Sequence, residues 1–398
     1  MRITKLESLH ADGGWRTFSF LKLSTDEGLV GWSEYSDGFG AGGTTDLIQR
    51  FAPIVIGMDP REVARLSASL HAVTRLAAGG LNTQAIAAIE NACLDVKAKA
   101  LGVPVCQLFG GAVRDRLTVY WSHCGMFRLR FPEFFEKHLG KPRIRDRDDL
   151  KRLGEEAVER GFKAIKTNPI FFGGPEPRSF NGGFRIAPGF LERNPDADIV
   201  GSVTEVLAAF RDGLGAKPGI LCDLNFSQRT EGFIRIAKAA EPFNLTWLEC
   251  DSHDPKALAA VRRATATPIA SLESIYGLAG YRPFFEAYAV DAAIIDVPWN
   301  GLYQAVRIAT LADAFEVNVA PHNFYGPIAD LMSAHFCAAI PNFRIMEYEA
   351  DDVPWKQELL TEPYRVEKGE FVLPSGPGWG AEINEEAVRA HPPAAQRR

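Results

Sequence analysis

Short apolar segments recur along the second half of the chain, and each ends in a side chain that can carry a charge. These ends lie 23 to 26 residues apart, at Asp223, Glu249, Glu273, Asp296, His322 and Glu347. A buried parallel strand is a continuous apolar run, and the crossover to the next parallel strand needs a helix, so this interval fits one strand, one helix and two loops. The spacing therefore predicts a repeated unit of a β-strand followed by an α-helix.

Two further apolar segments, residues 117–123 and 162–167, precede these six and bring the number of predicted strands to eight. We therefore expect an α/β fold with a (β/α)8-type barrel, a modified TIM barrel, over residues 116–350. The active site of such a barrel lies at the carboxyl ends of its strands. The six ionisable side chains would meet there around one substrate.

The first 115 residues do not follow this interval. A helix is expected to begin at the capping pair Asn82-Thr83 and to end at Gly102. Two or three antiparallel strands are expected before it, at residues 3–10, 17–25 and 29–35. These elements predict a separate α+β domain over residues 1–115.

The last segment, residues 351–398, contains one expected hairpin, at residues 364–366 and 371–372, but no barrel strand remains for it to join. We therefore expect this segment to pack on the N-terminal domain. Two connections, residues 124–147 and 168–198, are too long for ordinary loops of the repeat. Long irregular loops in enzymes are commonly lids or binding loops, so we expect both to cover the barrel mouth.

The composition excludes several classes of partner. A net charge of -6 gives no reason to expect nucleic acid or an anionic membrane. The six cysteines have no paired spacing, which favours buried thiols in a reducing compartment over disulfides. No apolar run approaches the roughly 20 residues of a membrane span, and the N-terminus lacks the apolar region of a signal peptide. We therefore expect a soluble protein of the cytoplasm.

Three carboxylates stand at successive strand ends, on Asp223, Glu249 and Glu273. They would repel one another unless a hard cation neutralised them. Mg²⁺ prefers oxygen ligands and leaves positions open for a substrate carboxylate, so these three residues are its predicted ligands. A helix cap or a solvated loop acid is the alternative for any one of them, but it explains three in register poorly.

Asp296 and His322 end the next two strands, so their side chains can meet. A carboxylate that accepts from one ring nitrogen fixes the tautomer and leaves the other nitrogen as a general base. A structural histidine beside a loop acid is the alternative. On the second strand, Lys166 and Asn168 face the same side, toward the substrate if that side is the mouth. A single lysine is more often a solvated surface charge.

The segment Gly38-Phe39-Gly40-Ala41-Gly42-Gly43 satisfies the spacing of a dinucleotide-binding loop. However, the strand before it belongs to an antiparallel meander, and no strand that ends in an acid follows about 20 residues later. A loop that contacts the substrate is the better interpretation.

Three sequence motifs occur together in this chain. They are a helix at residues 85–101 followed by Gly-x-Pro and Leu-x-Gly-Gly up to residue 111, Ala-Pro-His-Asn at residues 320–323, and Ile-Met-Glu-Tyr at residues 345–348. This set resembles the enolase superfamily, in its mandelate racemase subgroup, over nearly the whole chain. The resemblance implies a barrel with a capping domain, made of the N-terminal block and the C-terminal segment, and a homo-oligomer.

The resemblance also implies a role for each site residue. The three carboxylates match the ligands of one Mg²⁺ per active site, and the Asp-His pair matches the family's dyad. Glu347 matches the glutamate that hydrogen-bonds the developing enediolate, Lys166 matches the first lysine of a Lys-x-Lys motif, and Asn225 matches a polar substrate contact. Capping-domain loops that carry Trp15, Arg16 and residues 36–43 would contact the far end of the substrate.

One position departs from the racemases of this subgroup. They carry a second lysine where this chain has Asn168, which cannot take a proton. Dehydration needs only one base, together with an acid for the departing hydroxide, and His322 could serve as both in turn. Muconate-lactonising and dipeptide-epimerase arrangements need a lysine on the sixth strand, where Asp296 stands.

The sequence therefore predicts a Mg²⁺-dependent carbon-oxygen lyase, a dehydratase of an aldonate or aldarate. His322 would remove the α-proton, the metal with Lys166 and Glu347 would stabilise the enediolate, and loss of the β-hydroxyl would give a 2-keto-3-deoxy acid. A racemase or epimerase that uses the same enediolate, or a non-catalytic relative that binds sugar acids, is the alternative. A distal carboxylate, and thus a diacid, would be favoured by an arginine at the mouth, the candidates being Arg16, Arg128, Arg130 and Arg178.

Overall fold

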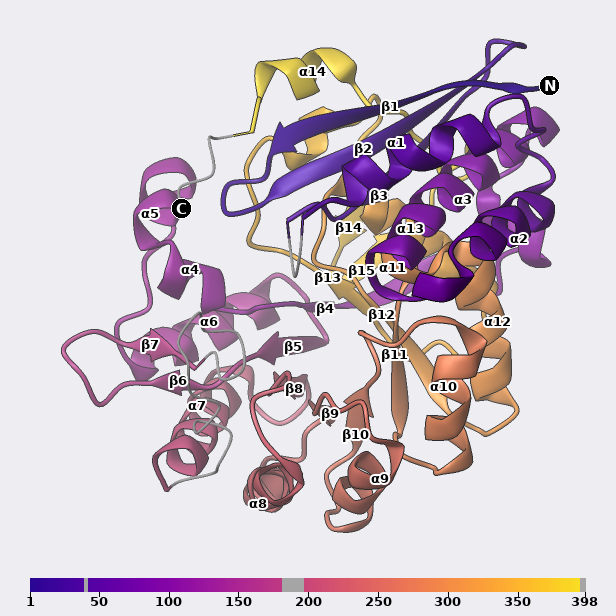
Figure 1. Ribbon diagram of the computed structural model, residues 1–398. Coiled ribbons are helices and arrows are strands. Elements are labelled where there is room, and N and C mark those ends of the chain that lie inside the picture. Colours follow the sequence, from indigo (N-terminus) through magenta and orange to yellow (C-terminus); the bar gives the residue numbers. More distant parts are fainter. Residues whose placement is uncertain (39–41, 181–196, 394–398) are drawn as a thin grey trace.

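Eight parallel strands in the described part of the chain form the predicted barrel (Figure 1). The computed structural model describes residues 1–38, 42–180 and 197–393. β13 pairs with β4, and Phe343 forms a bridge with Val319 of β12, so the ring of strands closes. In chain order the strands are β4 (Arg116–Trp121), β5 (Ala164–Thr167), β8 (Gly219–Asp223), β9 (Trp247–Glu249), β10 (Ile269–Ser271), β11 (Ala292–Asp296), β12 (Asn318–His322) and β13 (Met346–Tyr348).

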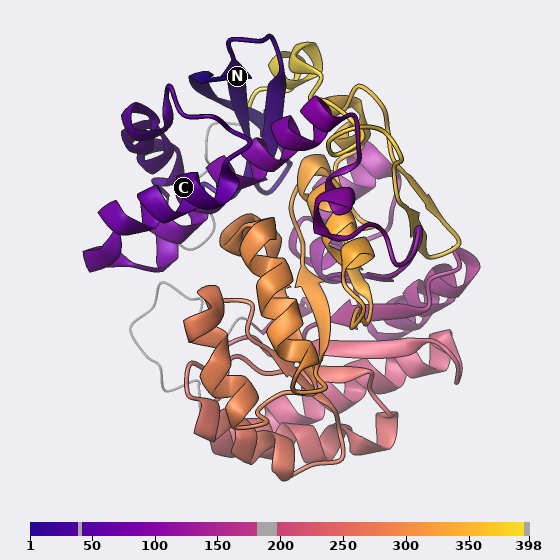
Figure 2. The same cartoon turned by 90° about the vertical axis from the view of Figure 1, so that its right-hand side faces the viewer.

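Helices cover the outside of the barrel, and Figure 2 shows several of them against the strands. They are α6 (Arg147–Glu159), α7 (Ala197–Leu214), α8 (Thr230–Ala240), α9 (Pro255–Arg263), α10 (Gly277–Glu286), α12 (Leu302–Asp313) and α13 (Pro327–Ala339), with the short α11 (Val297–Asn300) and the 3-10 turn η4 (Glu241–Phe243). α13 is buried along nearly its whole length, from Pro327 to Ala338. In α8 the buried positions follow the helical period, since Gly232, Phe233, Ile236, Ala237 and Ala240 form one stripe.

The N-terminal part is an antiparallel sheet with helices, as predicted. The sheet contains β1 (Ile3–Asp12), β2 (Thr17–Thr25) and β3 (Val30–Tyr35), and the helices are α1 (Thr44–Val55), α2 (Val63–Val73), α3 (Gly80–Leu101) and the 3-10 turns η1 (Arg75–Ala77) and η2 (Val105–Phe109). The predicted start of α3 at Asn82-Thr83 is wrong, because Gly79 is the N-cap and the Asn82 side chain donates to the carbonyl of Ala77 instead. The helix ends at Gly102, whose φ of 68° suits glycine.

Buried hydrogen bonds join this sheet to the barrel. The carboxylate of Glu34, on β3, accepts from the backbone N–H groups of Gly326, Ile328 and Ala329 at the start of α13. An acid is favoured there because the first turn of a helix has unpaired N–H groups and a positive dipole end. The N-terminal sheet therefore fixes the chain just beyond the end of β12.

The C-terminal segment contains the expected hairpin, formed by β14 (Arg365–Glu367) and β15 (Glu370–Val372), and also η5 (Lys356–Leu359) and α14 (Glu385–Ala390). The expectation that no barrel strand is left for this hairpin is wrong. β13 pairs only with residues 119–121 of β4, and β15 pairs antiparallel with residues 116–118 of the same strand. The end of the segment lies against β1, where the N–H of Asp12 donates to the carbonyl of His391.

The first long connection is helical rather than irregular, with α4 (Met126–Arg130) and α5 (Pro132–Leu139). The second begins with a hairpin of β6 (Ile170–Phe171) and β7 (Arg178–Ser179). The rest of the expected lid, residues 181–196, and residues 39–41 of the glycine-rich segment lie outside the described residues.

All six cysteines are buried and free, as the sequence predicts. Among the described residues, no helix combines the length and the apolar character that a membrane crossing requires.

His335 makes stability depend on pH. This buried residue of α13 contacts the N–H of Cys106 through Nδ1 at 3.4 Å and the carbonyl of Trp379 through Nε2 at 3.2 Å, which fits one neutral tautomer. Burial lowers its pKa from the usual 6.5 to about 4. The unfolded chain therefore binds the extra proton first, and the stability due to neutral His335 is complete above pH 6.5 and lost as the pH falls toward 4. Relative to His335→Gln, which does not titrate, the wild type should lose about 3 kcal/mol of unfolding free energy between pH 7 and pH 4 in urea titrations.

Candidate active site

The predicted site residues point into the barrel mouth because side chains alternate along a strand. The barrel interior is filled by Tyr120, Ala164, Leu221, Trp247, Ala270, Ala292, Ile294, Ala320 and Ile345. The side chain two positions after most of these faces the same way, at the carboxyl end of its strand. This relation accounts for Lys166, Asp223, Glu249, Asp296, His322 and Glu347.

Glu273 reaches the mouth by a different route. Two positions after Ala270 stands Leu272, whose φ of 96° is rare for a residue with a side chain. This turn of the backbone breaks the alternation, and the next side chain, Glu273, comes within 3.5 Å of Nε2 of His322. Strain of this kind often occurs at functional sites.

His322 and Asp296 form the predicted pair. Nδ1 of His322 lies 2.6 Å from Oδ2 of Asp296, which also accepts from the hydroxyl of Tyr325 at 2.5 Å, while Oδ1 accepts from the N–H of Trp299 at 2.7 Å. Burial alone would lower the pKa of His322, but the carboxylates of Glu273 and Asp296 outweigh it and raise this pKa to about 10. The hydrogen bond between Nδ1 and Asp296 fixes the orientation of the ring, so Nε2 faces Glu273 at the mouth.

Lys166 lies among three acids, with Nζ 2.8 Å from Oε1 of Glu347, 3.4 Å from Oε2 of Glu249 and 4.0 Å from Oδ2 of Asp223. It is buried rather than a solvated surface charge. Asp223 and Glu249 are register partners on neighbouring strands. Burial, with the repulsion between acids, raises the pKa of Glu249 and of Glu273 to about 8 against the opposing charges of Lys166 and His322. Lys166 and His322 therefore do not supply enough positive charge to balance the acids of this cluster.

The donor set of this cluster fits a hard cation. Asp223, Glu249 and Glu273 supply only carboxylate oxygens, and Oε1 of Glu249 is buried without a hydrogen-bond partner among the described residues. As these side chains are oriented, no three His, Cys, Asp or Glu residues in the described ranges are arranged to hold a metal ion. The reason is that Lys166 faces two of the acids and His322 faces the third. Binding a cation would require these side chains to turn toward one point.

Glu347 is held as an anion. Its Oε1 accepts from Oγ of Ser122 at 2.5 Å and from Lys166, and its Oε2 accepts from the N–H of Asn323 at 2.6 Å. Burial alone would raise the pKa of Glu347, but Lys166 and His322 hold it well below its usual range. As an ionised carboxylate Glu347 accepts from the donors around it and orients them, and its hydrogen bond to a developing enediolate stays a prediction.

The two asparagines predicted as substrate contacts both bind Asp223. Nδ2 of Asn168 donates to the carbonyl of Asp223 at 2.9 Å, and Asn225 donates to both carboxylate oxygens, from its backbone N at 2.7 Å and from Nδ2 at 2.9 Å. These bonds fix the position of a predicted metal ligand. A direct contact of either asparagine with substrate stays a prediction.

Trp15 and Arg16 lie on the loop between β1 and β2. The indole of Trp15 packs among four phenylalanine rings, Phe127, Phe131, Phe134 and Phe135, of the first long connection. Arg16 pairs with Asp352 at 2.7 Å and donates to the carbonyl of Tyr325, while its Nε and Nη1 are buried with no hydrogen-bond partner in the described ranges. Their contact with substrate also stays a prediction.

The other arginines predicted to bind a distal carboxylate of the substrate differ in the contacts that they already make. Arg128 is buried, and its guanidinium forms ion pairs with Asp351 and Glu156. Arg130 donates to the hydroxyl of Ser179, and Arg178 lies over the ring of Phe171.

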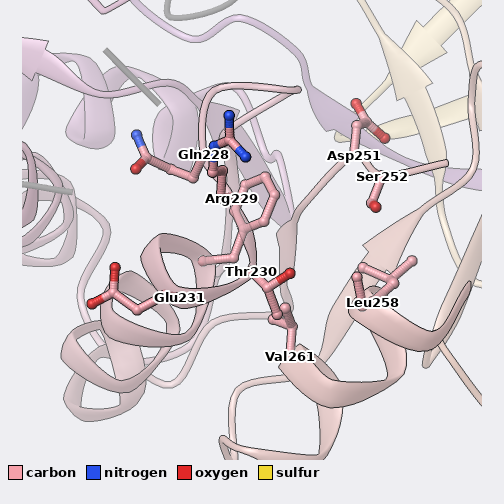
Figure 3. A pocket seen from close by; sticks show the side chains of 10 residues that line it. Gln228, Arg229, Thr230, Glu231, Asp251, Ser252, Leu258 and Val261 are labelled. Carbon is pink, nitrogen blue, oxygen red and sulfur yellow. The ribbon is translucent and has the colours of Figure 1, made fainter. Parts of the chain in front are cut away.

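Sequence reasoning missed several polar groups at the mouth. The alternation that begins at Tyr120 could have indicated Ser122, but nothing in the sequence indicates His123, Glu349 or Tyr325. Asp251, just after β9, accepts from Oγ of Ser271, and its buried Oδ2 has no hydrogen-bond partner within the residues that the structure describes. Figure 3 shows Asp251 across a neighbouring pocket of about 330 Å³ from Gln228 and Arg229.

Comparison with known proteins places this fold and site in one class. Residues 12–110 match the N-terminal domain of the mandelate racemase / muconate lactonizing enzyme family, and residues 149–387 match the enolase C-terminal domain-like family. The chain belongs to the mandelate racemase / muconate lactonizing enzyme family of the enolase superfamily, which confirms the resemblance and the fold class.

Among the relatives are dehydratases of sugar acids. The chain is 30% identical to the D-xylonate dehydratase of Haloferax volcanii, over 98% of this chain and 88% of that protein. It is 28% identical to the D-gluconate dehydratase of Thermoproteus tenax, over 96% and 72%. A crystal structure from Burkholderia xenovorans strain LB400, provisionally named as an L-alanine-DL-glutamate epimerase and bound to magnesium and fumarate, shares 44% identity with a TM-score of 0.95, over 99% of this chain and 96% of that one.

Proposed function

We propose that this protein is a dehydratase of sugar acids, an aldonate or an aldarate, and that it forms a 2-keto-3-deoxy acid. The observation that carries this proposal is the oriented pair of His322 and Asp296, with Nε2 of His322 facing the carboxylate cluster. The relatives named as xylonate and gluconate dehydratases support the substrate class.

The side chains of the mouth have complementary roles in this reaction. The ammonium group of Lys166 donates a hydrogen bond to one oxygen of the substrate carboxylate and stabilises the negative charge that develops there. Glu347, as an anion, holds Lys166 and Ser122 in place. His322 removes the α-proton through Nε2, and Asp296 stabilises the imidazolium that results.

Asp223, Glu249 and Glu273 would hold one Mg²⁺ per active site. The bound ion would supply a Lewis acid for the substrate carboxylate. The 44% identical structure, which contains magnesium and a carboxylate compound, supports this assignment. The charge of a bound Mg²⁺ would also offset that of Glu273, whose carboxylate makes the largest contribution to the raised pKa of His322. The pKa of His322 would then fall, so the imidazole could act as a base near neutral pH.

Two observations favour dehydration over epimerisation, in spite of the epimerase name of that structure. β11 ends in Asp296, bonded to His322, where the dipeptide-epimerase arrangement has a lysine. Asn168, at the position of a second base, donates to a backbone carbonyl and cannot take a proton. We also infer a homo-oligomer, as the family resemblance implies.

The test is to incubate the protein with Mg²⁺ and a panel of aldonates and aldarates in D₂O, with assays for 2-keto acid and for deuterium at the α-carbon. A dehydratase forms keto acid from some members of the panel. Deuterium exchange without keto acid would instead identify a racemase or epimerase. Neither signal from any sugar acid would indicate a binding protein and contradict the proposal.

A further inference from the structure

His123 and Glu349 form a second pair of histidine and carboxyl group at the barrel mouth. Nδ1 of His123 lies 2.9 Å from Oε2 of Glu349 and 3.1 Å from Oγ of Ser122. His123 follows β4, Glu349 follows β13, and these strands are neighbours in the barrel. Glu349 is 1% exposed, so its carboxyl group depends on the protein for its partners.

This second pair shares its surroundings with His322. The ring of Phe324 contacts both imidazoles, with its centroid 6.1 Å from that of His123 and 5.0 Å from that of His322. His123 also stacks on Phe127 at 4.7 Å, and its φ of 45° is unusual for a residue with a side chain. Its surroundings therefore hold the imidazole in one orientation.

One atom of the pair is open to a ligand. The side chain of His123 is 20% exposed, and within residues 1–38, 42–180 and 197–393 its Nε2 makes no hydrogen bond. Nε2 of His322, in contrast, is turned toward Glu273. Each imidazole is thus oriented by an acid on Nδ1, and the ring of Phe324 lies beside both.

The environment of the pair favours a hydrogen on Nε2 of His123. Burial lowers the pKa of His123 to about 3, and it raises the pKa of Glu349 well above its ordinary value, so the pair as a whole is neutral. One proton then lies between Nδ1 and Oε2. The lowered pKa of His123 and the raised pKa of Glu349 favour this proton on Oε2 of Glu349, which then donates to Nδ1 of His123. With the proton on either atom, Nε2 carries the second hydrogen.

We infer that His123, backed by Glu349, is the general acid that protonates the departing β-hydroxyl of the substrate. This inference rests on the proposed dehydratase function and assigns the acid to a group other than His322. The α-carbon–hydrogen bond breaks, and its proton goes to Nε2 of His322. The electron pair forms the double bond between the α- and β-carbons as the carbon–oxygen bond breaks. The leaving oxygen takes the proton from Nε2 of His123 and departs as water, and the enol that remains becomes the 2-keto acid.

The experiment compares His123→Gln with the wild type on two substrates. One is a sugar acid that the wild type dehydrates, and the other is its β-fluoro analogue. Fluoride is a far weaker base than hydroxide and leaves without a proton. We expect His123→Gln to lose about 10²- to 10⁴-fold in kcat for water loss but to keep fluoride elimination and α-hydrogen exchange. Glu349→Gln, which removes the acid that contacts His123, should also lower kcat for water loss and keep fluoride elimination, but the loss should be smaller than for His123→Gln.

The controls separate this inference from the function on which it rests. His138→Gln, an exposed histidine of α5 that packs on Phe134, should match the wild type on both substrates. Retained fluoride elimination would also prove that His123→Gln is folded. An equal loss for both leaving groups, or no loss for either, would overturn the role of His123. A wild type that forms no keto acid would overturn the proposed function and the inference with it.

Discussion

His322→Asn is expected to lower the rate of keto-acid formation by about 10²- to 10⁴-fold, because the reaction has no other base for the α-proton. Asparagine is close in size and can keep a hydrogen bond to Asp296, but it cannot take a proton near neutral pH. The same factor should appear in the exchange of the α-hydrogen with solvent and in fluoride elimination from a β-fluoro substrate. The measurements are kcat by keto-acid assay and deuterium incorporation by mass spectrometry.

A matched control is His253→Asn. His253 contacts Oγ of Ser274 and the ring of Phe226 at an exposed position, and its replacement should leave all three rates unchanged. If His322→Asn retained α-hydrogen exchange, another group would be the base. The assignment of the dyad to proton abstraction would then be wrong.

Glu249→Gln is expected to weaken Mg²⁺ binding by at least about 100-fold, and removal of divalent ions with a chelator should abolish turnover until Mg²⁺ is restored. Loss of a group that merely orients a ligand costs about 10- to 100-fold in affinity, and loss of a charged ligand costs at least as much. Glu249 is fully buried, Lys166 contacts its Oε2, and its Oε1 has no hydrogen-bond partner in the described part of the chain. The measurement is calorimetric titration of chelator-treated protein with magnesium chloride.

Glu231→Gln provides the comparison, since Glu231 is an exposed acid of α8 that pairs with Arg235. It should bind Mg²⁺ as the wild type does. A wild-type protein that takes up no magnesium in this titration would remove the basis of the proposed chemistry, whatever its activity toward sugar acids.

The regular spacing of strand ends predicts most of the barrel, because one strand and one helix consume a nearly constant length of chain. Alternation along each strand then indicates which side chain faces the mouth, and it correctly groups Lys166, Asp223 and Glu249. Both arguments depend on local geometry that every parallel barrel shares.

Other parts of the site depend on contacts that no local pattern encodes. The orientation of Glu273 follows from the positive φ of Leu272, which breaks the alternation. His123 and Glu349 meet because β4 pairs with β13 across more than half the chain. The position of Trp15 follows from helices in a connection that was expected to be irregular.

The hydrogen bonds of Glu34 have a consequence for enzyme engineering. This acid belongs to the N-terminal sheet, yet it anchors the first turn of α13, which follows the end of β12 at His322 and the loop that contains Tyr325. The surroundings of His322, the proposed base, are therefore set partly by a segment that precedes the barrel. A barrel expressed from residue 116 onward would lack this anchor, and a chimera that exchanges capping domains between relatives to alter specificity would have to retain an acid at this position.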